Sequence, residues 1–248
     1  MMNAKPTIVL VHGAFADGSS WDGVIERLQR DGYRVEAPAI ALRGVGVDSA
    51  YLASVVNQVD GPVLLVGHSY GGALISNAAN EVDNVVGLVF VAAFAPDTDE
   101  VLGDVAAESK DSVLMTTQVQ RTYPTGENGE TAPEFSIDPG KLREVFAADL
   151  PEERTAVMAA TQRPVAAAAF SDRSGPPAWK SLPSWAVVAT ADKAAGTDLV
   201  RSMANRAGAE VTEIESSHVV MMSHPQAVTD VIVKAARAVE ARNALAAK

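Results

Sequence analysis

The sequence predicts an α/β fold built on a doubly wound, mostly parallel sheet of about six strands. Four short runs are continuously apolar instead of alternating, which is typical of strands covered on both faces. Segments with helical spacing of apolar residues separate these runs, and alternating strands and helices indicate a parallel sheet. The 248 residues, 48% of them hydrophobic, are enough to bury a substantial core. We therefore expect one domain over residues 1–248 that carries an insertion.

In chain order, strands are expected at residues 7–13, 34–39, 62–68, 85–94, 184–192 and 210–217. The second and the last of these are more polar than the others, so they fit the edges of the sheet. Helices are expected at residues 20–32, 47–61 and 197–208, directly after Ser69, and from residue 223 to the C-terminus. Gly32 and Gly208 end two of them, since glycine is common just past the last helical turn.

One span, from about residue 96 to residue 179, breaks this alternation. It has no strand-like run, and its segment YPTGENGETAPE (123–134) is typical of an exposed loop. Short helical pieces recur around 99–109, 139–149 and 152–160. Because the apolar content is modest, we expect a helical cap inserted between two core strands at 96–179, not an independent domain.

Composition excludes several classes of function. The net charge of −11 argues against nucleic acid or an anionic membrane as a partner, because both would be repelled. The chain has no cysteine, which excludes disulfides and thiolate metal sites and favours a reducing, cytoplasmic location. The N-terminal residues lack the layout of a signal peptide, and no motif with metal-ligand or phosphate-binding spacing is present. We expect a small-molecule substrate, no cofactor and no metal, with a homodimer through the apolar face of the C-terminal helix as an option.

The stretch GHSYG (67–71) follows a predicted strand and opens a predicted helix. G-x-S-x-G in this context is the nucleophile elbow, a strained turn that presents a serine above the sheet. Ser69 is therefore the candidate nucleophile. The backbone N–H of Tyr70, at the helix N-terminus, would point at an oxyanion.

A serine needs a base at neutral pH, and the base needs an orienting carboxylate. Of the four histidines, His218 lies in the loop between the last strand and the last helix, on the same sheet edge as Ser69. His12 and His68 sit at strand ends, where local hydrogen bonds are expected. His224 falls in the first turn of the last helix.

The carboxylate should end a strand between the serine and the histidine in sequence. Asp192 fits best, and Asp97, which follows the fourth strand, is the alternative. The second oxyanion donor is expected in the loop after the first strand, where the N–H of Ala14 is the best candidate and Phe15 the neighbouring one. Residues that could line a pocket under the cap are Phe15, Met115, Phe146, Met158, Phe170 and Met221, although such residues are also common in cores.

With these motifs assembled, LVHGAFADGSSW, GHSYGGALI, ATAD and SHVVMMSHPQAV resemble the α/β-hydrolase superfamily. Within it, the chain is similar to small esterases related to plant hydroxynitrile lyases and methyl-ester esterases. The similarity covers nearly the whole chain and is weakest at about 100–180. It implies an α/β-hydrolase fold with Ser69 as nucleophile, His218 as general base and acid, and Asp192 as its orienter. It also implies that Ala14 and Tyr70 supply the oxyanion-hole amides.

Two departures favour hydrolysis over the lyase reaction. The related lyases carry a small hydroxyl residue and a lysine where this chain has Gly13 and Val219. Epoxide hydrolases and haloalkane dehalogenases of this fold use aspartate at the position of Ser69. We therefore expect a serine esterase acting on a small-to-medium ester or lactone. A carbon–carbon lyase, a cofactor-independent oxygenase and a non-catalytic receptor are the alternatives.

Overall fold

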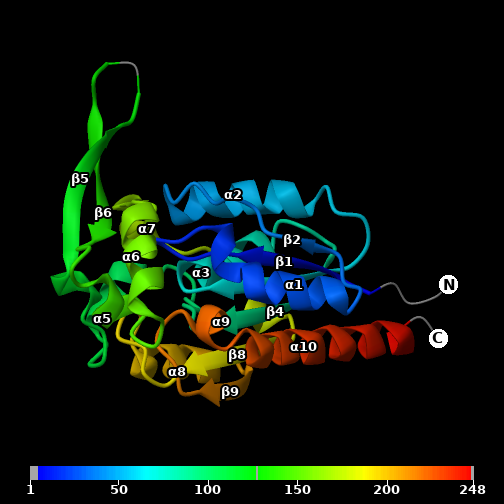
Figure 1. Ribbon diagram of the computed structural model, residues 1–248. Coiled ribbons are helices and arrows are strands. Elements are labelled where there is room, and N and C mark those ends of the chain that lie inside the picture. The colour runs from blue at the N-terminus through cyan, green and yellow to red at the C-terminus, as the bar shows by residue number, and fades with distance from the viewer. Residues whose placement is uncertain (1–4, 127, 247–248) are drawn as a thin grey trace.

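The computed structural model describes residues 5–126 and 128–246. Its central sheet has six parallel strands in the order β2-β1-β3-β4-β8-β9 (Figure 1). The strands are β1 (Thr7–Val11), β2 (Val35–Glu36), β3 (Val63–His68), β4 (Val85–Val91), β8 (Ser184–Ala189) and β9 (Glu210–Ile214). Every residue of β1, β3 and β8 is buried, whereas β2 and β9 at the two edges are partly exposed. The parallel sheet predicted from the continuous apolar runs is confirmed.

Helices cover both faces of this sheet. They are α1 (Asp22–Arg30), α2 (Val45–Val56), α3 (Tyr70–Ala78), α8 (Thr197–Arg206), α9 (Val220–Ser223) and α10 (Pro225–Ala246), with a 3₁₀ turn, η1 (Gly18–Trp21), before α1. β4 shows the two layers: a Cβ on Gly87 would lie 3.1 Å from Val239 of α10, while Phe90 contacts Gly72 of α3. Since these two β4 residues are three positions apart, they point to opposite faces.

The apolar face of α10 packs inside the chain, against α1, β4 and β8. Val228, Ile232, Ala235 and Val239 of this helix are buried there. This face therefore supplies no argument for a homodimer.

The segment 96–179, which we call the cap segment, joins β4 to β8 at one end of the sheet. It holds α4 (Leu102–Ala107), η2 (Leu114–Thr116), β5 (Gln118–Pro124), β6 (Thr131–Ile137), α5 (Leu142–Phe146), α6 (Glu152–Thr161), β7 (Val165–Ala166), α7 (Ala168–Ser171) and η3 (Ala178–Lys180). Helices α4, α5 and α6 occupy the three places where helical pieces are predicted. The purely helical prediction is wrong for β5 and β6, which form an antiparallel hairpin that extends away from the body (Figure 1).

The hairpin escapes the sequence pattern because β5 is exposed along most of its length and so carries no apolar run. Cross-strand pairs hold it instead, from Gln118 opposite Ile137 to Pro124 opposite Thr131, and β7 adds a third strand. Gly129, with a φ of +72°, lies in the connection between the two strands, in a conformation that favours glycine.

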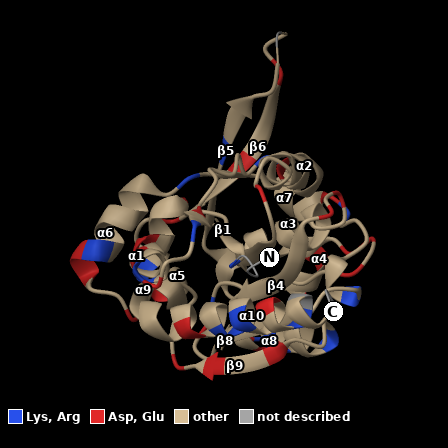
Figure 2. Cartoon of the chain, turned by 90° about the vertical axis from the view of Figure 1, so that its right-hand side faces the viewer, with Lys and Arg blue, Asp and Glu red and all other residues tan. Residues whose placement is uncertain are grey.

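In Figure 2 the positions of charged residues are coloured on the outer helices and on β9, and the central strands β1 and β4 contain no charged residue. This separation is what a sheet buried on both faces requires, since unpaired charges are costly inside a protein. Within residues 5–126 and 128–246, no helix is both long and apolar enough to cross a membrane.

Candidate active site

Ser69 lies at the tight turn between β3 and α3. Its backbone has φ +53° and ψ −121°, a strained conformation that non-glycine residues adopt mainly at functional turns. The flanking glycines let chain segments touch: a Cβ on Gly67 would lie 2.5 Å from the Gly71 oxygen, and one on Gly71 would lie 2.6 Å from the Val11 oxygen. The turn predicted from G-x-S-x-G is therefore present at the carboxyl edge of the sheet.

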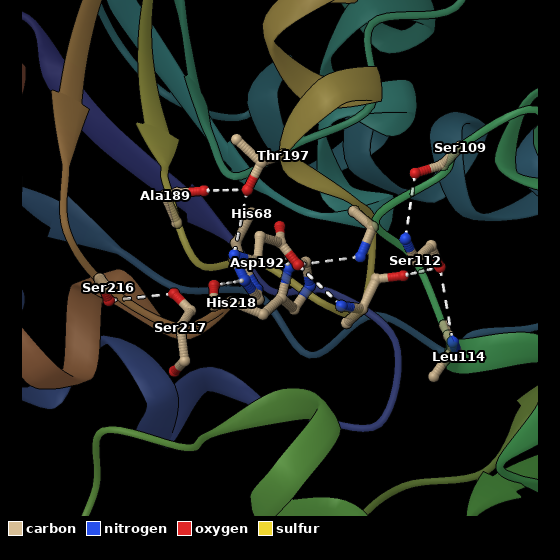
Figure 3. Close-up of polar contacts among 12 residues, drawn as sticks. His68, Ser109, Ser112, Leu114, Ala189, Asp192, Thr197, Ser216, Ser217 and His218 are labelled. Carbon is tan, nitrogen blue, oxygen red and sulfur yellow. Dashed lines mark hydrogen bonds and ion pairs between the residues drawn. The ribbon is translucent and has the colours of Figure 1, made fainter.

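His218 and Asp192 form a buried hydrogen-bonded pair on the same edge (Figure 3). Nδ1 of His218 lies 2.7 Å from Oδ2 of Asp192, and the two side chains are 1% and 0% exposed. The other carboxylate oxygen accepts the backbone amides of Ala194 (2.8 Å) and Ala195 (3.0 Å). Because a carboxylate only accepts, Nδ1 carries the proton, and Nε2 of His218 is left as the basic nitrogen.

His68 connects the Ser69 turn to His218, so the prediction of a local contact is wrong for this residue. Its Nε2 donates to the carbonyl oxygen of His218 at 3.1 Å, across 150 residues of sequence, and the two rings lie 4.6 Å apart between centroids. Burial holds the pKa of His68 well below its ordinary value, so the ring is neutral. Its Nδ1 is buried and has no hydrogen-bond partner among the described residues.

The loop after β1 passes directly against Ser69. A Cβ on Gly13 would lie 2.7 Å from Cβ of Ser69 and 2.9 Å from Nδ1 of His68, so a larger residue does not fit without a shift. Ala14 follows and is buried, and Phe15 has a φ of +62°. The loop therefore places Gly13, the residue before Ala14, directly against Ser69.

The other two histidines lie outside this pair. His12 keeps a local contact, with Nδ1 2.9 Å from the Gly13 oxygen, and its Nε2 accepts the Ile40 amide at 3.0 Å. His224 is exposed, with Nδ1 3.0 Å from the Ser223 hydroxyl, just before α10 begins. Throughout the described ranges, no group of three or more His, Cys, Asp or Glu residues is arranged to hold a metal ion.

Asp97, the alternative partner for the histidine, lies elsewhere. It forms an ion pair with Lys180 and accepts the Thr98 amide at 2.6 Å, and its side chain is 32% exposed. Asp192 therefore occupies the position beside His218.

A cavity of about 240 Å³ is lined by Val219, which follows His218 in the sequence, and by Phe146, whose ring packs on His218; His218 and Ser69 themselves are not among its lining residues. Phe15, Phe146 and Val219 form its wall on the His218 side. The Phe146 ring lies 5.0 Å from the His218 ring and meets the Phe15 ring edge-on at 6.2 Å. Helix α6 supplies another wall through Arg154, Val157, Met158 and Thr161.

Of the predicted lining residues, Phe15, Phe146 and Met158 border this cavity. Met221 borders a smaller neighbouring cavity of about 140 Å³. Phe170 packs on Tyr70 instead, with ring centroids 6.4 Å apart, and Met115 is 57% exposed. Sequence reasoning missed the rest of the α6 wall, although its i, i+3, i+4, i+7 spacing is the signal of one helix face.

A further buried carboxylate, Asp48, lies behind the Ser69 turn. The Tyr70 phenol donates to its Oδ2 at 2.9 Å, and the backbone amides of Arg43 and Gly44 donate to the same oxygen at 3.0 and 3.4 Å. The other oxygen of Asp48 is buried and has no partner within the described chain. Burial raises the pKa of Asp48, and the three hydrogen bonds offset only part of that rise. No motif in the sequence indicates this contact.

Known proteins resemble this chain in sequence and in fold. Residues 8–231 match the model of the alpha/beta hydrolase family. The chain is 30% identical over 164 residues to a pyrethroid hydrolase of Sphingobium wenxiniae, covering 59% of this chain and 56% of that protein. It is 33% identical over 108 residues to Methylesterase 8 of Arabidopsis thaliana, covering 38% of this chain and 40% of that protein. These matches thus span about half or less of the relatives' length.

Among solved structures, a pyrethroid hydrolase from Sphingobium faniae JZ-2 has a TM-score of 0.76 to this chain at 22% identity, covering 94% of this chain and 98% of that one. At that identity the likeness concerns the fold. The matched residues 8–231 include Ser69, Asp192 and His218 together with the whole central sheet apart from Thr7. The chain belongs to the alpha/beta hydrolase family.

Proposed function

We propose that the protein is a serine hydrolase that cleaves a carboxylic ester through an acyl-enzyme formed on Ser69. The observation that carries the proposal is the buried 2.7 Å hydrogen bond between His218 and Asp192, on the sheet edge where the strained turn presents Ser69. Relatives named pyrethroid hydrolase and methylesterase support the same class of reaction.

In the acylation step, the Ser69 hydroxyl attacks the ester carbonyl carbon while Nε2 of His218 takes its proton. Asp192 keeps the proton on Nδ1 and stabilises the imidazolium that forms. The backbone amides of Ala14 and Tyr70 are the proposed donors to the oxyanion of the tetrahedral intermediate. When the intermediate collapses, the alkoxide leaves with the proton from Nε2, and the acyl group remains on Ser69.

Deacylation repeats the sequence with water as the nucleophile. Nε2 of His218 takes a proton from the water as its oxygen attacks the acyl carbon. The second tetrahedral intermediate expels the Ser69 oxygen, which regains its proton from His218. The products are a carboxylic acid and an alcohol, and no redox step or cofactor is needed.

The cavity lined by Phe146 and Val219, the neighbours of His218, supports a small-to-medium, moderately apolar substrate. At about 240 Å³ it exceeds the roughly 150 Å³ cavity that accepts benzene in another protein. Phe15, Phe146, Met158 and Val219 give it apolar walls. A short alkyl chain or a single aromatic ring on either side of the ester therefore suits this space.

Two observations count against the hydroxynitrile-lyase alternative. The position of Gly13 has no room for a side chain, because an added Cβ would lie 2.7 Å from Cβ of Ser69. Val219 is buried and borders the cavity, so the position expected for a lysine presents an apolar group.

We also propose a cytoplasmic enzyme that binds neither nucleic acid nor membrane. The net charge of −11 and the absence of cysteine support this assignment.

The test is hydrolysis of p-nitrophenyl acetate, butyrate and octanoate by the wild type beside Ser69→Ala. We expect turnover by the wild type and none above background by the variant, with octanoate the poorest substrate. Equal rates for the two proteins would remove Ser69 as the nucleophile. Mass spectrometry of the wild type quenched during turnover should show the acyl group on Ser69.

A further inference from the structure

The cap segment contacts both loops that carry the proposed base and its partner. On the Asp192 side, the hydroxyl of Ser112 (labelled in Figure 3) donates to the Ala194 oxygen at 2.6 Å. The Val113 amide donates to the Lys193 oxygen at 2.9 Å. These cap residues bind backbone carbonyls only. Further along, at the start of α8, the cap residue Asp111 accepts the Asp198 amide at 3.0 Å. On the His218 side a charged side chain binds the two residues directly before the proposed base.

That side chain is Asp149, in the link between α5 and α6. Its carboxylate accepts the Ser216 hydroxyl at 2.8 Å and the Ser217 amide at 3.1 Å, and it also accepts the Ser217 hydroxyl. Ser216 and Ser217 are the two residues immediately before His218 in the sequence. The Asp149 residue itself is exposed, but both serines are buried, at 3% exposure each.

These contacts hold the His218 loop at several points. The Ser216 oxygen is also 2.9 Å from the Ser223 oxygen, so the network crosses the loop from its start to the end of α9. Partial burial alone would raise the pKa of Asp149, but the hydrogen bonds from Ser217 and Ser216 outweigh it and leave the pKa below its ordinary value. Asp149 is therefore an anion at neutral pH, and its charge strengthens each of these bonds.

Phe146 adds a second contact from the same link. It lies three residues before Asp149, and its ring packs 5.0 Å from the imidazole of His218. One short stretch of the cap segment thus contacts the ring of His218 and holds the backbone just before it. Within the described part of the chain, Asp149 is the only charged cap side chain that hydrogen-bonds to residues 215–219.

We propose that Asp149 is a positioning residue for His218. By holding Ser216 and Ser217 it fixes the backbone that carries His218, whose side chain is bonded to Asp192 and is the proposed base for Ser69. This rests on the proposed function, because the effect is exerted on the proposed general base. Displacing a catalytic group by about 1 Å can cost roughly 10²-fold in rate, so a loosened loop should reduce kcat while substrate binding in the cavity persists.

The experiment compares the wild type with Asp149→Ala, Asp149→Asn and Asp138→Ala. Asp138 is the matched control, since it is another exposed cap aspartate that accepts a backbone amide, that of Gly140 at 2.8 Å, away from His218. Two rates are measured: turnover of p-nitrophenyl acetate, and labelling of Ser69 by diethyl p-nitrophenyl phosphate, followed by mass. Circular dichroism and thermal unfolding check that each variant folds.

We expect Asp149→Ala to lower kcat and the labelling rate by roughly 10–10²-fold with little change in KM. Asp149→Asn keeps one acceptor oxygen and should fall between Asp149→Ala and the wild type, while Asp138→Ala should match the wild type. The proposal is overturned if Asp149→Ala behaves like Asp138→Ala, or if it raises KM alone. If Asp149→Ala does not fold, the proposal is tested with Asp149→Asn, using the same rates of ester turnover and Ser69 labelling.

The two readouts separate this proposal from the proposed function. If the wild type is labelled at Ser69 but hydrolyses no ester, the proposed function fails, and the ratio of labelling rates still decides the role of Asp149. If the wild type is not labelled at all, Ser69 is not an activated nucleophile, and both proposals fall.

Discussion

At the scale of the residue, the partner of each buried histidine fixes its tautomer. Nε2 of His12 accepts the Ile40 amide, so the proton of His12 is on Nδ1. His68 carries its proton on Nε2, which donates to the His218 carbonyl oxygen. His218 carries its proton on Nδ1, which donates to Asp192. Burial lowers the pKa of both His12 and His68. These two rings therefore stay neutral when His218 takes up a proton, and Asp192 is the anion that stabilises the resulting charge.

The first prediction concerns Asp192. Asp192→Asn replaces the acceptor with an amide and removes the charge that fixes the His218 tautomer, so kcat for ester hydrolysis should fall by roughly 10³–10⁴-fold. The matched control is Asp97→Asn, since Asp97 pairs with Lys180 on the surface. Steady-state kinetics of both variants on p-nitrophenyl butyrate make the test. A comparable loss in both would contradict the assignment of Asp192.

The second prediction concerns Gly13. Gly13→Ala introduces a Cβ that would lie 2.7 Å from Cβ of Ser69, and relieving that clash should cost about 1–3 kcal/mol of unfolding free energy as well as activity. Gly46→Ala is the control, because nothing lies within 4 Å of its added Cβ inside α2. That change should stabilise the fold by about 0.5–1 kcal/mol. Urea unfolding measures both, and an equally stable Gly13→Ala would count against the close approach.

At the scale of the element, Asp48 joins the start of α2 to the start of α3 through Tyr70. Burial raises the pKa of Asp48 in the folded state above its pKa in the unfolded state. At any pH between these two pKa values, Asp48 is therefore protonated more often in the folded state than in the unfolded state. The contribution of Asp48 to stability must then fall as pH rises through that window. The asparagine of Asp48→Asn does not titrate, so the stability of this variant does not include the decrease with pH that Asp48 causes.

The third prediction follows from this sign. The unfolding free energy of Asp48→Asn minus that of the wild type should increase as pH is raised from about 4 to about 8. Urea titrations at several pH values give the difference directly. Asp198→Asn is the control, because its unfolding free energy minus that of the wild type should decrease as pH rises. Hydrogen bonds from Ser109 and from backbone amides outweigh burial and lower the pKa of Asp198. A difference for Asp48→Asn that is flat with pH would refute the raised pKa.

The fourth prediction concerns α5 and the cavity. Phe146, at the end of α5, lies between the cavity and the His218 ring. Phe146→Leu removes ring atoms there and should raise kcat/KM for the octanoate ester relative to the acetate ester, by up to about tenfold. Val157→Ala changes the outer wall, where Val157 is 54% exposed, and should leave this ratio unchanged. A chain-length profile unaffected by Phe146→Leu would mean that substrate does not use this cavity.

At the scale of the whole molecule, the strands of the central sheet and the Ser69 turn could be predicted from the sequence, because each depends on residues that are close together in the chain. Residues 63–66 had to be apolar to lie in a sheet covered on both faces, and the G-x-S-x-G spacing follows from the turn itself. The positions of Asp192 and His218 follow from strand ends that meet at one edge of a parallel sheet. Sequence order alone therefore brings these side chains to one place.

The rest depends on contacts between distant segments. His68 bonds to a residue 150 positions away, and Asp149 to residues 67 and 68 positions away, and nothing in one sequence records such pairs. The hairpin of β5 and β6 is stabilised by cross-strand pairing in an exposed ribbon, so it shows neither an apolar run nor a buried face. The cap segment is for this reason the least predictable part of the chain.

The strand order also bears on how the protein is made. β1, β3 and β4 are neighbours in the sheet and are complete by Val91, so the Ser69 turn leaves the ribosome before the cap segment does. β8 and β9, which carry Asp192 and His218 at their ends, are synthesised only after the whole cap segment. A nascent or truncated chain that stops within the cap segment holds the serine but no base to activate it. The proposed hydrolytic activity therefore requires that synthesis has passed His218.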